Sequence, residues 1–145
     1  MKEKILSGEF TPNTNNRNTH WDSMYNGTKY RSSWEALYQF FNPNAEYEQL
    51  RIEYEFKNSR HAYIVDFVDH KNSAVIEVKP KSLCQGDKFI AKMSALTQWA
   101  ELNSYTVIIV DEYWFRQQDI KIQYDQFDEN TARKIKKLYE TNKKN

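Results

Sequence analysis

The sequence has almost no cysteine and little histidine. Its 145 residues include one cysteine, Cys84, and three histidines, His20, His61 and His70. A single thiol cannot close an internal disulfide, and the three imidazoles lack the spacing of metal ligands. We therefore expect a protein of a reducing cytoplasm without structural zinc.

Long hydrophobic runs are also missing. No window approaches the roughly 18 consecutive apolar residues of a membrane span. The first ten residues contain only Ile5 and Leu6 as a short apolar run, which is too little for a signal peptide. The sequence predicts neither a membrane span nor a secretion signal.

Neither sign of charge is in excess over the whole chain. The 21 Lys and Arg against 20 Asp and Glu leave a net charge of +1. Residues 1–34 carry +2, residues 35–127 carry −4 and residues 128–145 carry +3. Near-neutrality argues against a protein held on nucleic acid by charge alone. Acidic groups in the middle of a phosphate-handling protein would need a reason, and metal binding is one.

Aromatic residues are plentiful. Four Trp, ten Tyr and eight Phe make up 15% of the chain, enough area for a hydrophobic core. We find no internal repeat and no linker. The sequence predicts one globular domain over 1–145, with an extended Asn-rich arm over 1–30 and a basic terminal helix over 128–145.

Periodicity predicts the elements. Ser32 and Glu35 fit a capping box before a short amphipathic helix over 33–41, which Asn42-Pro43-Asn44 ends. Alternating patterns predict further strands at the following positions: 51–56, 62–68, 74–79 and, less regularly, 120–124.

A second helical pattern covers 87–102 and leads into the β-branched run 106–110, typical of a buried strand. The first three strands would form an antiparallel meander. Parallel pairing of 74–79 with 106–110 would add a crossover unit. The fold class expected is therefore α/β, a central mixed β-sheet flanked by helices.

The chemically informative residues are Asp66, Glu77 and Lys79. Side chains two apart on a strand share a face, so Glu77 and Lys79 project together, and strand pairing can place Asp66 beside Glu77. Two carboxylates and an ammonium in one patch are costly unless a divalent cation neutralises the acids. Mg²⁺ could take Asp66, Glu77 and the main-chain carbonyl of Val78 as ligands, with Mn²⁺ as a substitute.

This set would suit phosphodiester hydrolysis. Lys79 would orient or deprotonate the attacking water and offset transition-state charge, and Glu35 could complete the metal shell or hold Lys79. Structural interpretations stand beside these roles. Glu35 could be only a helix cap, and the strand carboxylates could belong to a solvated face.

Three further basic residues could contact phosphate or could simply be surface groups: Arg31, Lys88 and Lys92. The basic terminal helix could contact a nucleic-acid backbone, dock on a partner or serve solubility. The aromatic run Tyr113-Trp114-Phe115 fits a core or a partner surface better than base stacking.

The chain resembles the PD-(D/E)XK, or restriction-endonuclease-like, superfamily. The shared pattern is an acid on an N-terminal helix, an Asp at the end of one predicted strand and Glu-x-Lys in the next. More narrowly, the chain resembles the head-completion nucleases of tailed phages. The motifs that carry the resemblance are Phe10-Thr-Pro12, Tyr30-Arg-Ser-Ser-Trp-Glu35, Tyr63-Ile-Val-Asp66-Phe67, Glu77-Val-Lys-Pro80 and the helix around Ala91-Lys92 leading to Val107-Ile-Ile-Val-Asp-Glu112.

The resemblance covers residues 8–115. One departure is Val65, where the family pattern usually has proline; this position shapes the backbone and supplies no ligand. The resemblance implies a restriction-endonuclease-like core and a Mg²⁺-dependent DNA endonuclease with Glu35, Asp66, Glu77 and Lys79 as catalytic residues.

The role implied is DNA-end processing during phage head completion. It places the protein in the host cytoplasm or on the virion. The implied partners are DNA, head or neck proteins and a second copy of the chain. Two alternatives remain open: a free-standing homing or transposition-type endonuclease of the same superfamily, and a non-enzymatic phage structural protein that retains the fold.

Overall fold

The computed structural model describes residues 9–10, 22–118 and 120–143. Its contacts divide the chain into two compact units. Unit 1 comprises residues 1–14 and 44–109, and unit 2 comprises residues 15–43 and 110–145. Each unit has its own aromatic and aliphatic contacts.

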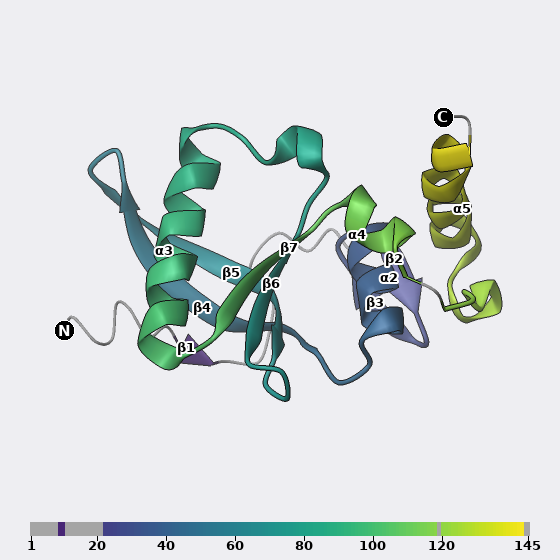
Figure 1. The fold of residues 1–145 in the computed structure, drawn as a ribbon, viewed down its shortest axis with the longest axis horizontal. Coiled ribbons are helices and arrows are strands. Elements are labelled where there is room, and N and C mark those ends of the chain that lie inside the picture. The colour runs from purple at the N-terminus through teal and green to yellow at the C-terminus, as the bar shows by residue number, and fades with distance from the viewer. Residues whose placement is uncertain (1–8, 11–21, 119, 144–145) are drawn as a thin grey trace. The chain divides into compact units, whose positions relative to one another are not determined.

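Unit 1 is an α/β layer structure with a five-stranded sheet in the order β1-β4-β5-β6-β7 (Figure 1). The strands are β1 (Glu9–Phe10), β4 (Glu46–Phe56), β5 (Ser59–Asp69), β6 (Ala74–Val78) and β7 (Thr106–Val110). The pairs β1 with β4, β4 with β5 and β5 with β6 are antiparallel. β6 and β7 run in the same direction (Figure 1), so the sheet is mixed as predicted.

Helix α3 (Asp87–Asn103) connects β6 to β7 and packs on the sheet. A short 3₁₀ helix, η1 (Lys81–Leu83), precedes it. The core between α3 and the sheet combines strand and helix residues: Leu50, Ile52, Tyr54, Tyr63, Val65, Val68, Val75, Leu96, Trp99 and Ala100. The strand-helix-strand crossover expected from the sequence is therefore present.

Local sequence explains the turns of unit 1. Lys57 and Asn58 both adopt positive φ, 53° and 63°, in the two-residue turn between β4 and β5. Such a turn matches the right-handed twist of the strands that it joins. In the longer link over 70–73 between β5 and β6, only Ser73 takes a positive φ. The predicted antiparallel meander is confirmed, although β4 and β5 are longer than expected.

The described residues of unit 2 form a hairpin, three α-helices and a 3₁₀ helix. The elements are β2 (Ser23–Tyr25), β3 (Thr28–Tyr30), α2 (Ser33–Phe41), α4 (Glu112–Arg116), the 3₁₀ helix η2 (Tyr124–Gln126) and α5 (Glu129–Lys143). Aromatic rings form much of its interior. Tyr25 stacks on Phe127, and Trp34 meets Phe115 edge-on.

Helix α2 has the predicted bounds and cap. The backbone N–H of Glu35 donates to the Ser32 hydroxyl at 3.1 Å, which satisfies one of the unpaired amides of the first turn. Ala36, Leu37 and Tyr38 are buried on the apolar side. The helix thus follows from its local sequence.

Three expectations about elements were wrong. Residues 23–30 form a hairpin instead of the end of an arm, because Asn26 and Gly27 adopt the positive φ of a tight turn. Residues 120–124 form no strand among the described residues, and η2 begins at Tyr124. Ile90 is apolar and widens the apolar stripe of the helical pattern over 87–102, which predicts a buried side chain, but it is 62% exposed. The rest of the predicted arm, except for β1, lies outside the described residues.

No helix in the described part of the chain combines the length and the apolar character that crossing a membrane requires. The chain passes three times between the two contact units. The expectation of a single domain over 1–145 stays a prediction.

Candidate functional site

Asp66, Glu77 and Lys79 lie in unit 1 where β6 ends: Asp66 lies within β5, Glu77 is the next-to-last residue of β6, and Lys79 follows that strand. The β5–β6 ladder pairs Phe67 with Ile76, so the next positions of the two strands are Asp66 and Glu77. The Asp66 Oδ2 atom accepts a hydrogen bond from the backbone N–H of Val78 at 2.7 Å. Strand pairing therefore brings the two acids together, as the sequence indicated.

Glu77 is a buried acid with identified partners. It is 6% exposed, its Oε1 atom accepts a hydrogen bond from the Tyr63 hydroxyl, and its Oε2 atom lies 3.9 Å from Lys79 Nζ. Burial raises the pKa of Glu77 above its ordinary value. The Tyr63 hydroxyl, Lys79 and Lys92 act in the opposite direction but do not cancel the effect of burial.

Helix α3 adds basic groups on the same side of the sheet. Lys92 Nζ lies 5.6 Å from the centroid of the Tyr63 ring, and Lys79 Nζ lies 5.9 Å from that of Phe89. Burial lowers the pKa of Lys92, opposed by the negative charge of Glu77 and Asp66 and reinforced by Lys79 and Lys88. Lys92 is thus part of the charged cluster, whereas the side chain of Lys88 is exposed.

Tyr63 is the first residue of the motif that contains Asp66, but nothing in the sequence indicates a role for it. It is 4% exposed, and burial, with the charges of Glu77 and Asp66, raises its pKa well above the ordinary value. Regular alternation would put Tyr63 and Asp66, three residues apart, on opposite faces. No local signal predicts their approach.

The sheet is irregular beside Asp66, where two β4 residues lie opposite this one β5 residue. Tyr63 and Val65 face the core, yet the next β5 residue in that core cluster is Val68, three positions on. Opposite this point the β4–β5 register shifts between Tyr47 and Leu50. The interrupted alternation at Asp66 resembles what a β-bulge does, re-aiming a side chain beside a site.

The remaining predicted residues, Glu35 and Arg31, lie in unit 2. Glu35 is in the first turn of α2, where its backbone is capped by Ser32. Arg31 lies between β3 and α2 and is half-buried. A role of either residue beside Asp66 stays a prediction.

The acid pair fits a hard cation that retains water. Within the described ranges, no group of three or more His, Cys, Asp or Glu side chains converges as a metal site. Asp66 and Glu77 offer carboxylate oxygens, and Mg²⁺ commonly uses one or two carboxylates and keeps several waters. The burial cost borne by Glu77 is the kind of cost that a bound cation offsets. The donor set therefore suits Mg²⁺ or Mn²⁺, with water as the remaining ligands, better than a metal whose ligands all come from the protein.

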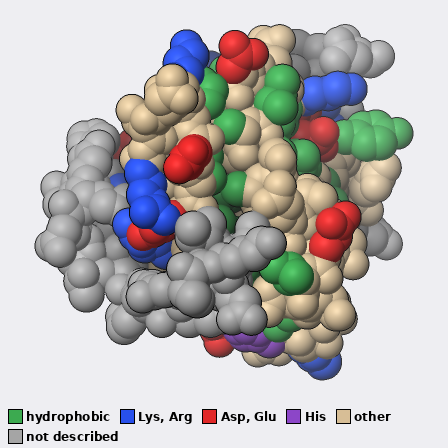
Figure 2. Space-filling view, turned by 90° about the vertical axis from the view of Figure 1, so that its left-hand side faces the viewer, with side chains coloured by type: hydrophobic (Ala, Val, Ile, Leu, Met, Phe, Trp, Pro, Cys, Tyr) green, Lys and Arg blue, Asp and Glu red, His purple; other side chains and the backbone are tan. Residues whose placement is uncertain are grey.

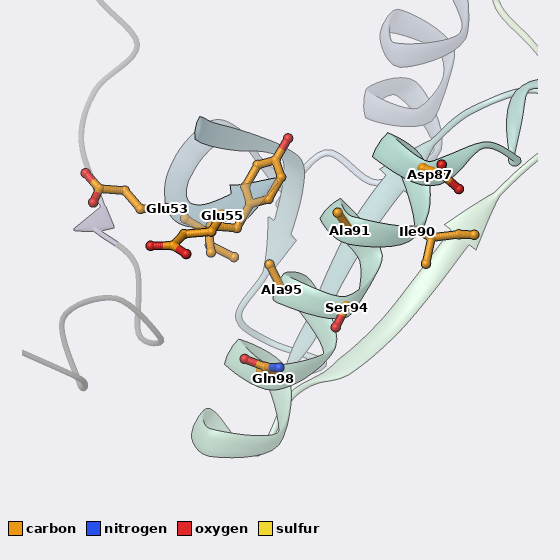
Figure 3. A pocket seen from close by; sticks show the side chains of 10 residues that line it. Glu53, Glu55, Asp87, Ile90, Ala91, Ser94, Ala95 and Gln98 are labelled. Carbon is orange, nitrogen blue, oxygen red and sulfur yellow. The ribbon is translucent and has the colours of Figure 1, made fainter. Parts of the chain in front are cut away.

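Two cavities lie elsewhere. The larger, about 460 Å³, lies between β4 and α3 and is lined by the carboxylates of Glu53, Glu55 and Asp87 together with apolar residues such as Ile90 and Ala91 (Figure 3). None of the predicted catalytic residues lines it. On the face drawn in Figure 2, acidic, basic and hydrophobic side chains of the described residues are interspersed.

Comparison of the chain with protein-family models, with curated proteins and with solved structures gave no match in any of the three.

Proposed function

We propose that this protein is a metal-dependent DNA endonuclease with a restriction-endonuclease-like core, and that Asp66, Glu77 and Lys79 are its catalytic residues. The observation that carries the proposal is the juxtaposition of the two acids at neighbouring positions of the paired strands β5 and β6, with Lys79 Nζ 3.9 Å from Glu77. The motif resemblance supports it from a separate direction.

The chain's own groups have distinct tasks in this proposal. Asp66, Glu77 and the main-chain carbonyl of Val78 would hold a Mg²⁺ ion, which when bound polarises a phosphoryl oxygen and lowers the pKa of water. Tyr63 and Lys79 engage different oxygens of Glu77 and so fix the orientation of its carboxylate. Lys79, 30% exposed in its side chain, can also reach a substrate phosphate and offset transition-state charge.

Glu35 enters the proposal through the motif resemblance, as does the role in phage head completion. Head completion implies activity on DNA ends and association with a head or neck protein. A homing or transposition-type enzyme would instead cut one long defined site, and a structural protein would cut nothing.

The test is cleavage of supercoiled, linear and branched DNA by the full chain with Mg²⁺, Mn²⁺ or EDTA. We expect metal-dependent cleavage that Lys79→Ala lowers by roughly 10² to 10³-fold while DNA affinity stays nearly unchanged. Lys71→Ala, an exposed lysine in the β5–β6 turn, is the matched control and should cleave like the wild type.

Cleavage that persists in Lys79→Ala under single-turnover conditions would reduce Lys79 to a phosphate contact. Absence of cleavage on all three substrates with both metals would contradict the nuclease proposal. Glu35→Gln in the same assay decides the role of Glu35, because a glutamine keeps the cap but cannot carry the negative charge.

A further inference from the structure

The second cavity, in unit 2, has the opposite charge to the first. It measures about 310 Å³ and lies between α2, α4 and α5; its lining residues are Trp34, Glu112, Arg116, Lys134, Lys137 and Leu138. Three cationic side chains face one carboxylate. A small concave site with excess positive charge favours an anionic group.

Helix α5 supplies the two lysines. Lys134 and Lys137 are three residues apart, and side chains at that spacing are neighbours on a helix surface. Both are exposed, whereas Ile135 and Leu138 are buried and hold the helix in unit 2. The ammonium groups therefore lie at the accessible side of the cavity.

Arg116 is held in place at the end of α4. Its Nη2 atom donates to the backbone carbonyl of Leu138 at 3.3 Å. The Tyr139 hydroxyl donates to the carbonyl of Phe115 at 3.2 Å, which makes a second tie between the two helices. The guanidinium is thus positioned before any ligand arrives, so that less side-chain freedom is lost on binding.

One donor of Arg116 has no acceptor. Its Nε atom is buried, and no residue that the structure describes accepts its hydrogen. Buried polar groups in proteins are nearly always paired, and guanidinium N–H groups match the oxygens of phosphate well. The guanidinium that carries this donor lines the same cavity as Lys134 and Lys137, and this set of cationic groups favours an oxyanion as the ligand.

Trp34 distinguishes a nucleotide from other anions. Its ring meets Phe115 edge-on, with 5.5 Å between centroids, and it also lines the cavity. Aromatic side chains beside basic groups are the usual means of holding single-stranded nucleic acid, because every base has a face that stacks. An acidic peptide would use the cations but would have less use for the indole.

We propose that this cavity binds a phosphodiester of DNA, with an unpaired base against Trp34. Arg116, Lys134 and Lys137 contact the phosphate. The choice of DNA over another polyanion rests on the proposed nuclease function. The acidic cavity of unit 1 would repel the same group, since its charged lining residues are all carboxylates.

Binding of a labelled oligothymidylate, measured by fluorescence anisotropy in EDTA, tests the proposal. The pocket variant is Lys134→Gln with Lys137→Gln. The control is Arg133→Gln with Lys136→Gln, two basic residues of the same helix that do not line the cavity. Both variants remove two positive charges from α5, so only their position differs.

We expect the pocket variant to bind about tenfold or more weakly and its logarithmic salt slope to fall by about 0.7, the value for one lost phosphate contact on a single strand. The control should stay within about threefold of the wild type. Equal losses in both variants, or no loss in either, would overturn the proposal. So would equal competition by polyglutamate and oligothymidylate.

Failure of the nuclease proposal can be recognised separately. If the wild type cleaves no DNA but the pocket variant alone loses oligothymidylate binding, the DNA site stands without the nuclease. If the wild type cleaves and the pocket variant binds and cleaves like it, only the pocket proposal fails. Melting curves of all variants confirm that the comparison is between folded proteins.

Discussion

At the scale of single residues, two buried tyrosines differ in the hydrogen bonding of their hydroxyl groups. Tyr63 and Tyr54 are 4% and 7% exposed and belong to the same core cluster. The Tyr63 hydroxyl donates to Glu77. The Tyr54 hydroxyl is buried and finds no partner in the described part of the chain.

Tyr63→Phe should therefore destabilise the protein while Tyr54→Phe should not. Loss of the Tyr63 hydroxyl leaves a buried carboxylate without its donor, which costs about 1 to 3 kcal/mol of unfolding free energy. Removal of the Tyr54 hydroxyl takes away an unsatisfied group and should be neutral or slightly stabilising. Urea denaturation of both variants measures the difference.

A double-mutant cycle of Tyr63→Phe with Glu77→Leu, which removes the acceptor oxygens, checks the cause. The two changes should be non-additive, since each removes one side of the same hydrogen bond. Additive changes would show that Tyr63 stabilises the core through its ring alone.

At the scale of elements, Asp128 connects helix α5 to strand β2 within unit 2. It precedes α5, and its Oδ2 atom accepts from the backbone N–H of Thr131 at 3.2 Å. Its Oδ1 atom accepts from the backbone N–H of Met24 in β2 at 2.7 Å. One carboxylate thus caps a helix and fixes it to the hairpin 104 residues earlier.

Asp128→Ala should lower stability by about 1 kcal/mol, the usual effect of losing a helix N-cap. Partial burial works to raise the pKa of Asp128, but hydrogen bonds from Thr131 and Met24 prevail, and the pKa lies below its ordinary value of 3.8. For a carboxyl with a lowered folded-state pKa, the unfolded state binds more protons in the window below 3.8. The contribution is present at neutral pH and disappears as pH falls through that window.

Thermal melts of wild type and Asp128→Ala across this pH range test the prediction. Their melting temperatures should differ at neutral pH and converge in acid. A constant difference would mean that the charge of Asp128 is irrelevant, and Asp128→Asn would then stabilise as well as the wild type.

At the scale of the whole molecule, cation binding and folding are linked. Any ligand that binds only the folded state raises the free energy of unfolding. If the acid pair binds Mn²⁺ with a dissociation constant of about 1 mM, then about 10 mM Mn²⁺ stabilises the protein by about 1.4 kcal/mol. This readout does not depend on cleavage.

The expected result is a melting temperature that rises with Mn²⁺ in the wild type and not in Asp66→Asn. Asp125→Asn, an exposed acid in η2, keeps the same charge change away from the acid pair and should behave like the wild type. A rise that survives in Asp66→Asn would place the cation elsewhere on the protein.

The sequence by itself determined the local elements and the identity of the charged residues. The capping box of Ser32 began α2 where predicted, and the spacing of Glu77 in β6 and Lys79, one residue beyond that strand, predicted that their side chains project together. These features depend on neighbours within a few residues, so that side-chain spacing and hydrogen bonding along the chain are sufficient to predict them. The turn between β2 and β3 is equally local, because Asn-Gly is a dipeptide that favours the positive φ of a tight hairpin turn.

Tertiary structure decided what alternation could not. The pairing of β5 with β6 brought the Tyr63 hydroxyl to Glu77 and the Val78 N–H to Asp66, and packing of α3 put Lys92 over the Tyr63 ring. Likewise, the packing of α4 on α5 joined Arg116 to Lys134 and Lys137 around one cavity. Each juxtaposition joins residues from separate elements, and the register and packing that create it depend on the folded core as a whole.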